Sequence, residues 1–196
     1  MNTYVISDNK FFLLGIANQE NYAEGSEGSV IPVFSKNVSS TFKPCERGAV
    51  VVLFISSSDE RHRITSIRAL HECRVLMLVK STGKQEYYSH SGRQFPWIVP
   101  HDIGLADLRQ HIVKARLTPF YRRYFTCTEV LLFRYLTQGI SIQNMANLNL
   151  SCKYLYTLKR KIILKNNIDG HDAAAIMICR DIIAMSNITL SAERAA

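Results

Sequence analysis

Lysine and arginine side chains are concentrated in the stretch NLSCKYLYTLKRKIILKNN (149–167), which contains five of them. Ammonium and guanidinium groups bind phosphate oxygens, and tyrosine and threonine side chains can reach base edges and methyl groups. Leucines and isoleucines separate these polar residues at regular intervals. The stretch therefore has the residue types of a surface that binds a polyanion, and equally those of a solvated helix face.

Helical periodicity divides this stretch into two faces. Ser151 has a side chain suited to an N-cap. At about 100° per residue, Leu155, Leu158 and Ile162 fall on one face, which we expect to pack against the protein. The opposite face is the candidate binding surface, and it carries Lys153, Tyr156, Thr157 and Arg160, with Lys161 at its margin. Lys165 turns toward a flank.

The net charge of +8 is unevenly distributed along the chain. Residues 1–116 hold 14 basic and 11 acidic side chains, whereas residues 117–168 hold eight basic side chains and one acidic side chain. A local basic block predicts a polyanionic partner, which is either nucleic acid or an anionic membrane surface.

Other classes of function find little support in the sequence. The five cysteines form no CxxC pair and the six histidines have no HxxxH spacing, so neither a disulfide framework nor a metal site is predicted. No glycine-rich phosphate loop is present, and the sequence contains neither a signal peptide nor a long apolar run. We expect a cytoplasmic protein that is not an enzyme and that uses no cofactor or metal.

Short apolar runs in the first half of the sequence predict β-strands. They cover residues 3–7, 29–34, 49–55, 74–80 and 95–99. Segments of helical period lie between or after them, at residues 59–73, 85–94 and 104–116. Parallel strands need crossover connections, so this alternation predicts an α/β doubly wound domain with a five-stranded parallel sheet.

The pattern changes at about residue 117. LTPFYRRY (117–124) is a basic connection that contains a proline, and every periodic segment after it is helical, with no further strand predicted. The predicted domains are therefore residues 1–116 and 125–196, with 117–124 as a linker. We interpret Arg122 and Arg123 as solvated. The linker aromatics Phe120, Tyr121 and Tyr124 are expected to seat the linker on a domain.

Four helices are predicted after the linker. Thr126 and Glu129 have the spacing of a capping box, and Gly139 is a natural helix end. The four segments are EVLLFRYLTQG, SIQNMANL, SCKYLYTLKRKIILK and HDAAAIMICRDIIAM. A short second helix, a tight turn and a longer third helix with a basic face are typical of a helix-turn-helix.

Residues 125–168 resemble the C-terminal DNA-binding domain of LuxR-type transcriptional regulators, the NarL/FixJ group. The residues that carry the resemblance are Thr126, Glu129, Gly139, Met145, Ala146, Leu150 and Ser151, followed by Leu155 and Ile162 at core positions. The resemblance implies an all-α four-helix domain that binds double-stranded DNA through Lys153, Tyr156, Thr157 and Arg160, and that dimerises through its fourth helix. The segment between Ala146 and Leu150 is one residue shorter than the usual family spacing.

The same family implies a receiver domain in the first half of the chain. VISDNKFFLLGI resembles the opening strand and helix of a receiver, with Asp8 and Asn9 where two acidic metal ligands are usual. Phe54 and Ile55 stand where the phosphoacceptor aspartate is expected, and Pro100 stands in the region of the usual lysine. Phosphoryl transfer needs that aspartate beside a bound magnesium ion. We therefore expect a degenerate receiver-like domain that cannot be phosphorylated.

These observations predict a two-domain transcription regulator that binds double-stranded DNA independently of phosphorylation, as a dimer. Two alternatives remain open. One is an accessory regulator that forms a heterodimer with another LuxR-type regulator. The other is a protein-interaction module whose basic helix binds an acidic partner or a membrane.

Overall fold

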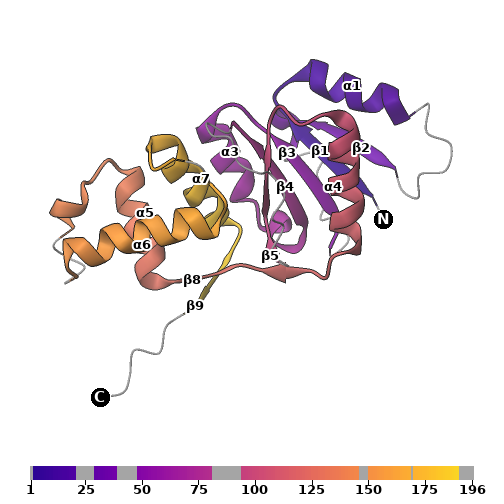
Figure 1. Ribbon diagram of the computed structural model, residues 1–196. Coiled ribbons are helices and arrows are strands. Elements are labelled where there is room, and N and C mark those ends of the chain that lie inside the picture. The colour runs from indigo at the N-terminus through magenta and orange to yellow at the C-terminus, as the bar shows by residue number, and fades with distance from the viewer. Residues whose placement is uncertain are drawn as a thin grey trace.

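The computed structural model describes residues 2–20, 29–38, 48–80, 94–145, 150–168 and 170–189. An α/β part is followed by a helical part, and the chain between them runs along one edge of the molecule (Figure 1). In the described part of the chain, no helix is long and apolar enough to cross a membrane.

The α/β part is built on a parallel five-stranded sheet, as predicted. Its strands lie in the order β2-β1-β3-β4-β6. They are β1 (Thr3–Ser7), β2 (Val30–Phe34), β3 (Val50–Phe54), β4 (Arg74–Val79) and β6 (Trp97–Pro100). The two central strands β3 and β4 are almost entirely buried, which explains why their sequences are continuous apolar runs.

Helices cover both faces of the sheet. Alternate strand residues point to opposite faces. Val5, Val52 and Leu76 pack with α1 (Lys10–Glu20) and α4 (Leu105–Leu117). On the other face, the packing elements are α3 (Ser58–Thr65), η1 (Ser35–Asn37) and η2 (Arg68–Glu72). The predicted helix at 59–73 is thus an α-helix followed by a 3-10 turn, and most of the helix predicted at 85–94 lies outside the described residues.

The helical part contains α5 (Cys127–Thr137), η3 (Ile142–Asn144), α6 (Cys152–Lys165) and α7 (Ala173–Ala184). The capping box is confirmed: Thr126 accepts a hydrogen bond from the Glu129 backbone, and Glu129 accepts one from the Thr126 backbone at 2.7 Å. Gly139 follows α5 with φ of 78°, a conformation that favours glycine. The helix predicted at SIQNMANL is a 3-10 turn at 142–144, and residues 146–149 lie outside the described residues.

Two short strand pairings include three strands, β7, β8 and β9, for which the sequence pattern predicted no strand. β7 (Tyr121–Arg122) pairs with β5 (Gln94–Phe95), and β8 (Tyr124–Thr126) pairs with β9 (Asn187–Thr189). β5 itself is separated from β6 by Pro96, so the single strand predicted at 95–99 is interrupted. Strands of two or three residues are too short to produce a period-2 pattern, and their partners are distant in sequence. The prediction that no strand follows residue 117 is therefore wrong.

The two parts are joined through a buried ionic cluster between α3 and α7. The fully buried Asp181 carboxylate accepts from Arg61 Nε at 2.7 Å and from Arg180 Nε at 3.0 Å. His62 Nδ1 lies 3.2 Å from the same carboxylate. Arg180 also donates to the Ser58 carbonyl at 2.7 Å. A buried charge requires such compensation, so these bonds hold α7 against α3.

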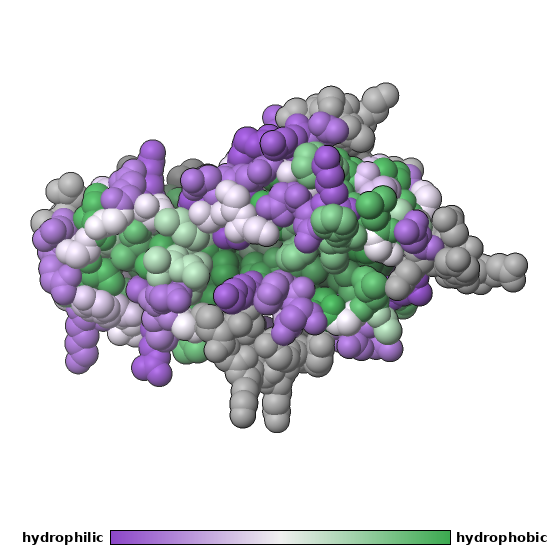
Figure 2. All heavy atoms as spheres, turned by 90° about the horizontal axis from the view of Figure 1, so that it is seen from above, coloured by the Kyte–Doolittle hydropathy of each residue, from purple (hydrophilic) through white to green (hydrophobic). Residues whose placement is uncertain are grey.

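Apolar side chains also reach the surface. Phe11 and Leu14 of α1 are 85% and 58% exposed, and Leu117 at the end of α4 is 81% exposed. The face seen from above in Figure 2 accordingly shows hydrophobic areas on both parts of the molecule, among polar side chains at the edges.

Candidate nucleic-acid interface

Helix α6 begins at its predicted cap and is amphipathic. The Ser151 hydroxyl accepts a hydrogen bond from the Tyr154 backbone N–H at 3.2 Å, which confirms the N-cap. Leu155 and Ile162 are 1% exposed and Ile163 is fully buried. These three side chains anchor the helix, so its opposite side faces solvent.

All five residues that the sequence singled out lie exposed on α6. They are Lys153, Tyr156, Thr157, Arg160 and Lys161. The structure thus brings the predicted residues together on the solvent side of one helix.

Two of these side chains are held in place. The Thr157 hydroxyl donates to the Lys153 carbonyl at 2.9 Å, so its oxygen can still accept a hydrogen bond. The Tyr156 hydroxyl accepts from Gln143 Nε2 of η3 at 2.8 Å. Tyr156 is therefore oriented by the element that precedes the turn, and this contact was not predicted.

The buried side of α6 is rotated from the predicted one. Leu158 is only half-buried, whereas Ile163 takes a core position. At about 100° per residue, this replacement rotates the buried direction by roughly 40°. Lys161 consequently lies well within the exposed face, and Tyr156 lies nearer its margin.

Sequence reasoning missed two residues of this exposed face. Tyr154 is 49% exposed and Leu164 is 55% exposed. In the run Ile162-Ile163-Leu164, only two of the three apolar residues can face the core. Testing each pair against the helical period could have identified Leu164 as the exposed residue. The exposed face thus contains an aromatic and an aliphatic side chain beside its cations.

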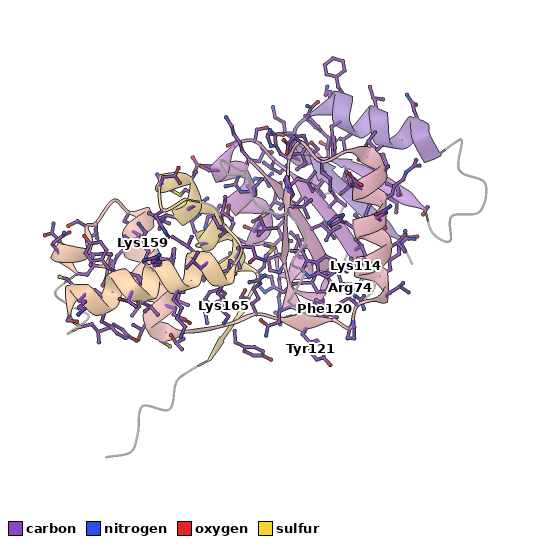
Figure 3. All side chains as sticks on the ribbon, viewed as in Figure 1. Arg74, Lys114, Phe120, Tyr121, Lys159 and Lys165 are labelled. Atoms are coloured by element: carbon purple, nitrogen blue, oxygen red, sulfur yellow. The ribbon has the colours of Figure 1, made fainter. Side chains whose placement is uncertain are left out.

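Lys159 and Lys165 take different positions from each other. Lys159 is half-buried and its Nζ donates to the His171 carbonyl at 3.0 Å. Lys165 is exposed at the C-terminal end of the helix. Figure 3 shows the two side chains on different sides of α6. Lys159 therefore serves the packing of the helical part, while Lys165 extends the basic surface.

The linker arginine Arg123 is buried, which corrects the interpretation that it is solvated. It is 9% exposed and donates to the Pro96 carbonyl at 3.1 Å, to the Lys165 carbonyl at 3.4 Å and to the Asn166 side chain. Burial lowers the pKa of its guanidinium to about 10, an effect that Cys179 partly opposes. The group is therefore charged at neutral pH, and it joins the end of α6 to the α/β part.

The aromatic residues of the linker divide into packed and exposed ones. Phe120 lies against Phe95 with ring centroids 6.1 Å apart, and the guanidinium groups of Arg74 and Arg122 lie 6.0 and 5.9 Å from its ring. Tyr121, in contrast, is 52% exposed and projects from the linker in Figure 3. Tyr124 is 53% exposed. The expectation that these three aromatics seat the linker is thus met by Phe120, whereas Tyr121 and Tyr124 are half exposed.

The carboxyl edge of the sheet was the other candidate for chemistry. Asp8 Oδ2 accepts from the Ser56 backbone N–H at 2.9 Å, and Phe54 packs edge-on against Phe12 with centroids 4.6 Å apart. Ile55 is buried and Pro100 is buried at the end of β6. Within the described residues, no three His, Cys, Asp or Glu side chains are grouped as metal ligands. The Asp8 carboxylate thus already binds backbone, and apolar side chains stand at the end of β3 and at the end of β6.

Comparison with known proteins gives similarities of structure only. No protein-family model matches the sequence, and no curated protein matches it significantly. Among solved structures, a complex of the two-component response regulator RcsB with DNA has a TM-score of 0.47 and 13% identity, covering 93% of this chain and 98% of that chain.

Two further structures cover the same shares of the two chains. RcsB from Salmonella enterica serovar Typhimurium, bound to promoter DNA with a phosphomimetic, has a TM-score of 0.49 and 15% identity over 93% of this chain and 98% of that chain. The response regulator ChrA of a heme-sensing two-component system has a TM-score of 0.34 and 16% identity, with coverage of 93% and 98%. At such low identities and TM-scores, the likeness assigns no function to this chain.

Proposed function

We propose that this chain is a transcription regulator that binds double-stranded DNA in a sequence-specific manner through the exposed face of α6. The observation that carries the proposal is the separation of the two faces of this helix. Ile162 and Ile163 anchor it in the core, while Lys153, Arg160 and Lys161 are exposed together. A helix presented in this way can enter the major groove, where arginine and lysine bind guanine or phosphate.

The contact between Gln143 and Tyr156 supports the same proposal. It joins the element before the turn to the helix after it, so Tyr156 is ordered before DNA arrives. Ordering a side chain in advance reduces the entropy lost on binding. Tyr156 and the Thr157 methyl group are then available to contact base edges or the thymine methyl group.

We further propose that this activity does not depend on phosphorylation. The support is the surroundings of Asp8, which binds the Ser56 backbone while Phe54 and Ile55 occupy the end of β3. Incubation with a small phosphodonor should leave the protein unmodified in intact mass measurement. A hydroxylamine-labile adduct on an aspartate would overturn this proposal. An acid-stable mass increase, which reports modification of a residue other than aspartate, would not contradict it.

The test of DNA binding is selection of bound fragments from genomic DNA. We expect one recovered motif, with two half-sites about one helical turn apart, because the proposed form is a homodimer. Arg160→Ala should lose enrichment of the motif. Equal recovery of all sequences by the unaltered protein would contradict sequence-specific binding.

The proposed partner also implies that the protein acts in the cytoplasm. It would act by binding DNA and not by catalysis, with no cofactor or metal.

A heterodimer with another LuxR-type regulator is the first alternative. The contact of α7 with α3 favours it, because the helix that the resemblance assigns to dimerisation is already held by Arg61 and Arg180. Light scattering of the free protein, followed by DNA binding with and without a candidate regulator, separates this alternative from a homodimer. A monomer that binds its motif only with the second regulator would favour the heterodimer.

A protein-interaction module is the second alternative. Leu164 and Tyr154 favour it, because both are about half exposed on the basic face. Binding to heparin, anionic vesicles and every DNA sequence with similar affinity would support this alternative.

A further inference from the structure

Arg123 places a positive charge beneath the surface where α6 ends. Its recorded partners are two backbone carbonyls and the Asn166 side-chain oxygen, and its Nε has no hydrogen-bond partner within the described structure. None of the ion pairs recorded for the described residues involves Arg123. A buried charge without a carboxylate leaves a net positive potential at the nearby surface.

The residues next to Arg123, in the chain or through its hydrogen bonds, include exposed side chains that suit an anion. Lys165 is exposed, and the bond from Arg123 to the Lys165 carbonyl places the linker directly beside it. Tyr121 and Tyr124 flank Arg123 in the chain and are 52% and 53% exposed. Neighbouring Arg122 is paired with Glu72 at 3.9 Å, so the acidic group near this surface is already compensated.

The C-terminal end of a helix normally repels anions, because its last carbonyls carry partial negative charge. At the end of α6 this effect is offset, since Arg123 donates to the Lys165 carbonyl and to the side chain of Asn166. Asn166 also donates to the Ile162 carbonyl at 2.6 Å. The last turn of α6 can therefore approach a phosphate group without the usual penalty.

The length of α6 brings this end to the DNA backbone. Its 14 residues span about 21 Å at 1.5 Å per residue. The major groove is about 12 Å wide, and the N-terminal residues of a recognition helix are those that contact bases. The last turn of α6 then reaches the edge of the groove, where the phosphates lie.

We propose that Lys165, Tyr124 and Tyr121 form a second DNA-contacting surface, which binds backbone phosphates beside the groove that α6 enters. The lysine ammonium pairs with one phosphate, and the tyrosine hydroxyls donate to phosphate oxygens. These contacts do not depend on sequence. The inference rests on the proposed function of α6, and it adds the linker to the proposed interface.

The test uses the full chain with the duplex recovered by genomic selection and with an unrelated duplex. Lys165→Gln should lower the slope of log affinity against log salt by about 0.9 and raise Kd roughly 5- to 10-fold at 0.1 M salt. The factor should be the same for both duplexes. Lys36→Gln is the matched control, because Lys36 is an exposed lysine on η1 in the α/β part.

A double variant, Tyr121→Phe with Tyr124→Phe, removes only the two hydroxyls from exposed side chains. It should weaken the phosphate-ethylation interference that flanks the motif, where Lys165 still contacts one phosphate, while leaving interference within the motif unchanged. The inference is overturned if Lys165→Gln matches Lys36→Gln and the double variant keeps the flanking interference at full strength. Failure of the proposed function is distinguishable, because the unaltered protein would then bind neither duplex or would bind both with equal affinity.

Discussion

The outer face of α6 and the junction between α3 and α7 both contain arginine, and they use it in opposite ways. Arg61 in the junction is buried and bonds the fully buried Asp181 at 2.7 Å. Arg160 on α6 is exposed, and none of the ion pairs recorded for the described residues involves it. A cation that is already paired with a buried carboxylate is not available to bind an external anion, whereas an exposed cation is. Burial and partners therefore separate arginines that hold the fold together from arginines that remain exposed to solvent, which composition alone cannot do.

The largest effect is expected from the junction. Asp181→Asn keeps the shape of the side chain but removes the negative charge that Arg61 and Arg180 share. Removing one member of a buried ionic cluster lowers the free energy of unfolding by about 3 to 5 kcal/mol. Urea unfolding measures this loss. Asp102→Asn is the control, because the Asp102 side chain is 73% exposed, and a similar loss in both variants would contradict a structural role specific to the junction.

A somewhat smaller effect tests the buried side of α6. Ile163→Ala should lower the free energy of unfolding by about 2 to 5 kcal/mol, because the side chain is fully buried and its removal leaves a cavity. Leu164→Ala, at the adjacent exposed position, should change it by about 0.5 kcal/mol or less. Thermal unfolding of the two variants compares them. Equal losses would mean that α6 is rotated differently from the structure.

The exposed face of α6 is tested by comparing two cations. Arg160→Ala should cost about 1 to 3 kcal/mol of discrimination between the selected motif and unrelated DNA, as expected for an arginine that contacts a base edge. Lys165→Ala should weaken binding to both duplexes by the same factor. Titration of each variant with both duplexes gives the ratio of its Kd for unrelated DNA to its Kd for the motif. If the two substitutions change this ratio equally, the exposed face of α6 acts only as a charged surface.

The smallest effect concerns the contact between Gln143 and Tyr156. Gln143→Ala should weaken binding to the motif by about 0.5 to 1 kcal/mol, because one hydrogen bond that orders Tyr156 is lost. The same loss is expected from Tyr156→Phe, which removes the hydroxyl. In a double-mutant cycle the two losses should not add. Full additivity would show that Gln143 does not act through Tyr156.

The sequence predicted those features of the fold that depend on neighbouring residues. The five strands of the sheet, the capping box of Thr126 and Glu129 and the N-cap of Ser151 all follow from local period or spacing, and each is present. The exposure of Lys153, Arg160 and Lys161 follows in the same way, because these residues share one side of an amphipathic helix. Their binding to DNA remains a prediction.

The tertiary structure decided the features that join residues distant in the chain. Arg123 was expected in solvent as part of a short basic linker, yet it bonds the Pro96 and Lys165 carbonyls from two parts of the protein. The pairing of β8 with β9 and the bonds of Asp181 have the same character. Local periodicity carries no information on which distant groups meet. The sequence by itself therefore determined the sheet strands, the helix caps and the basic face of α6, while only packing decided the short strand pairings and the burial of Arg123.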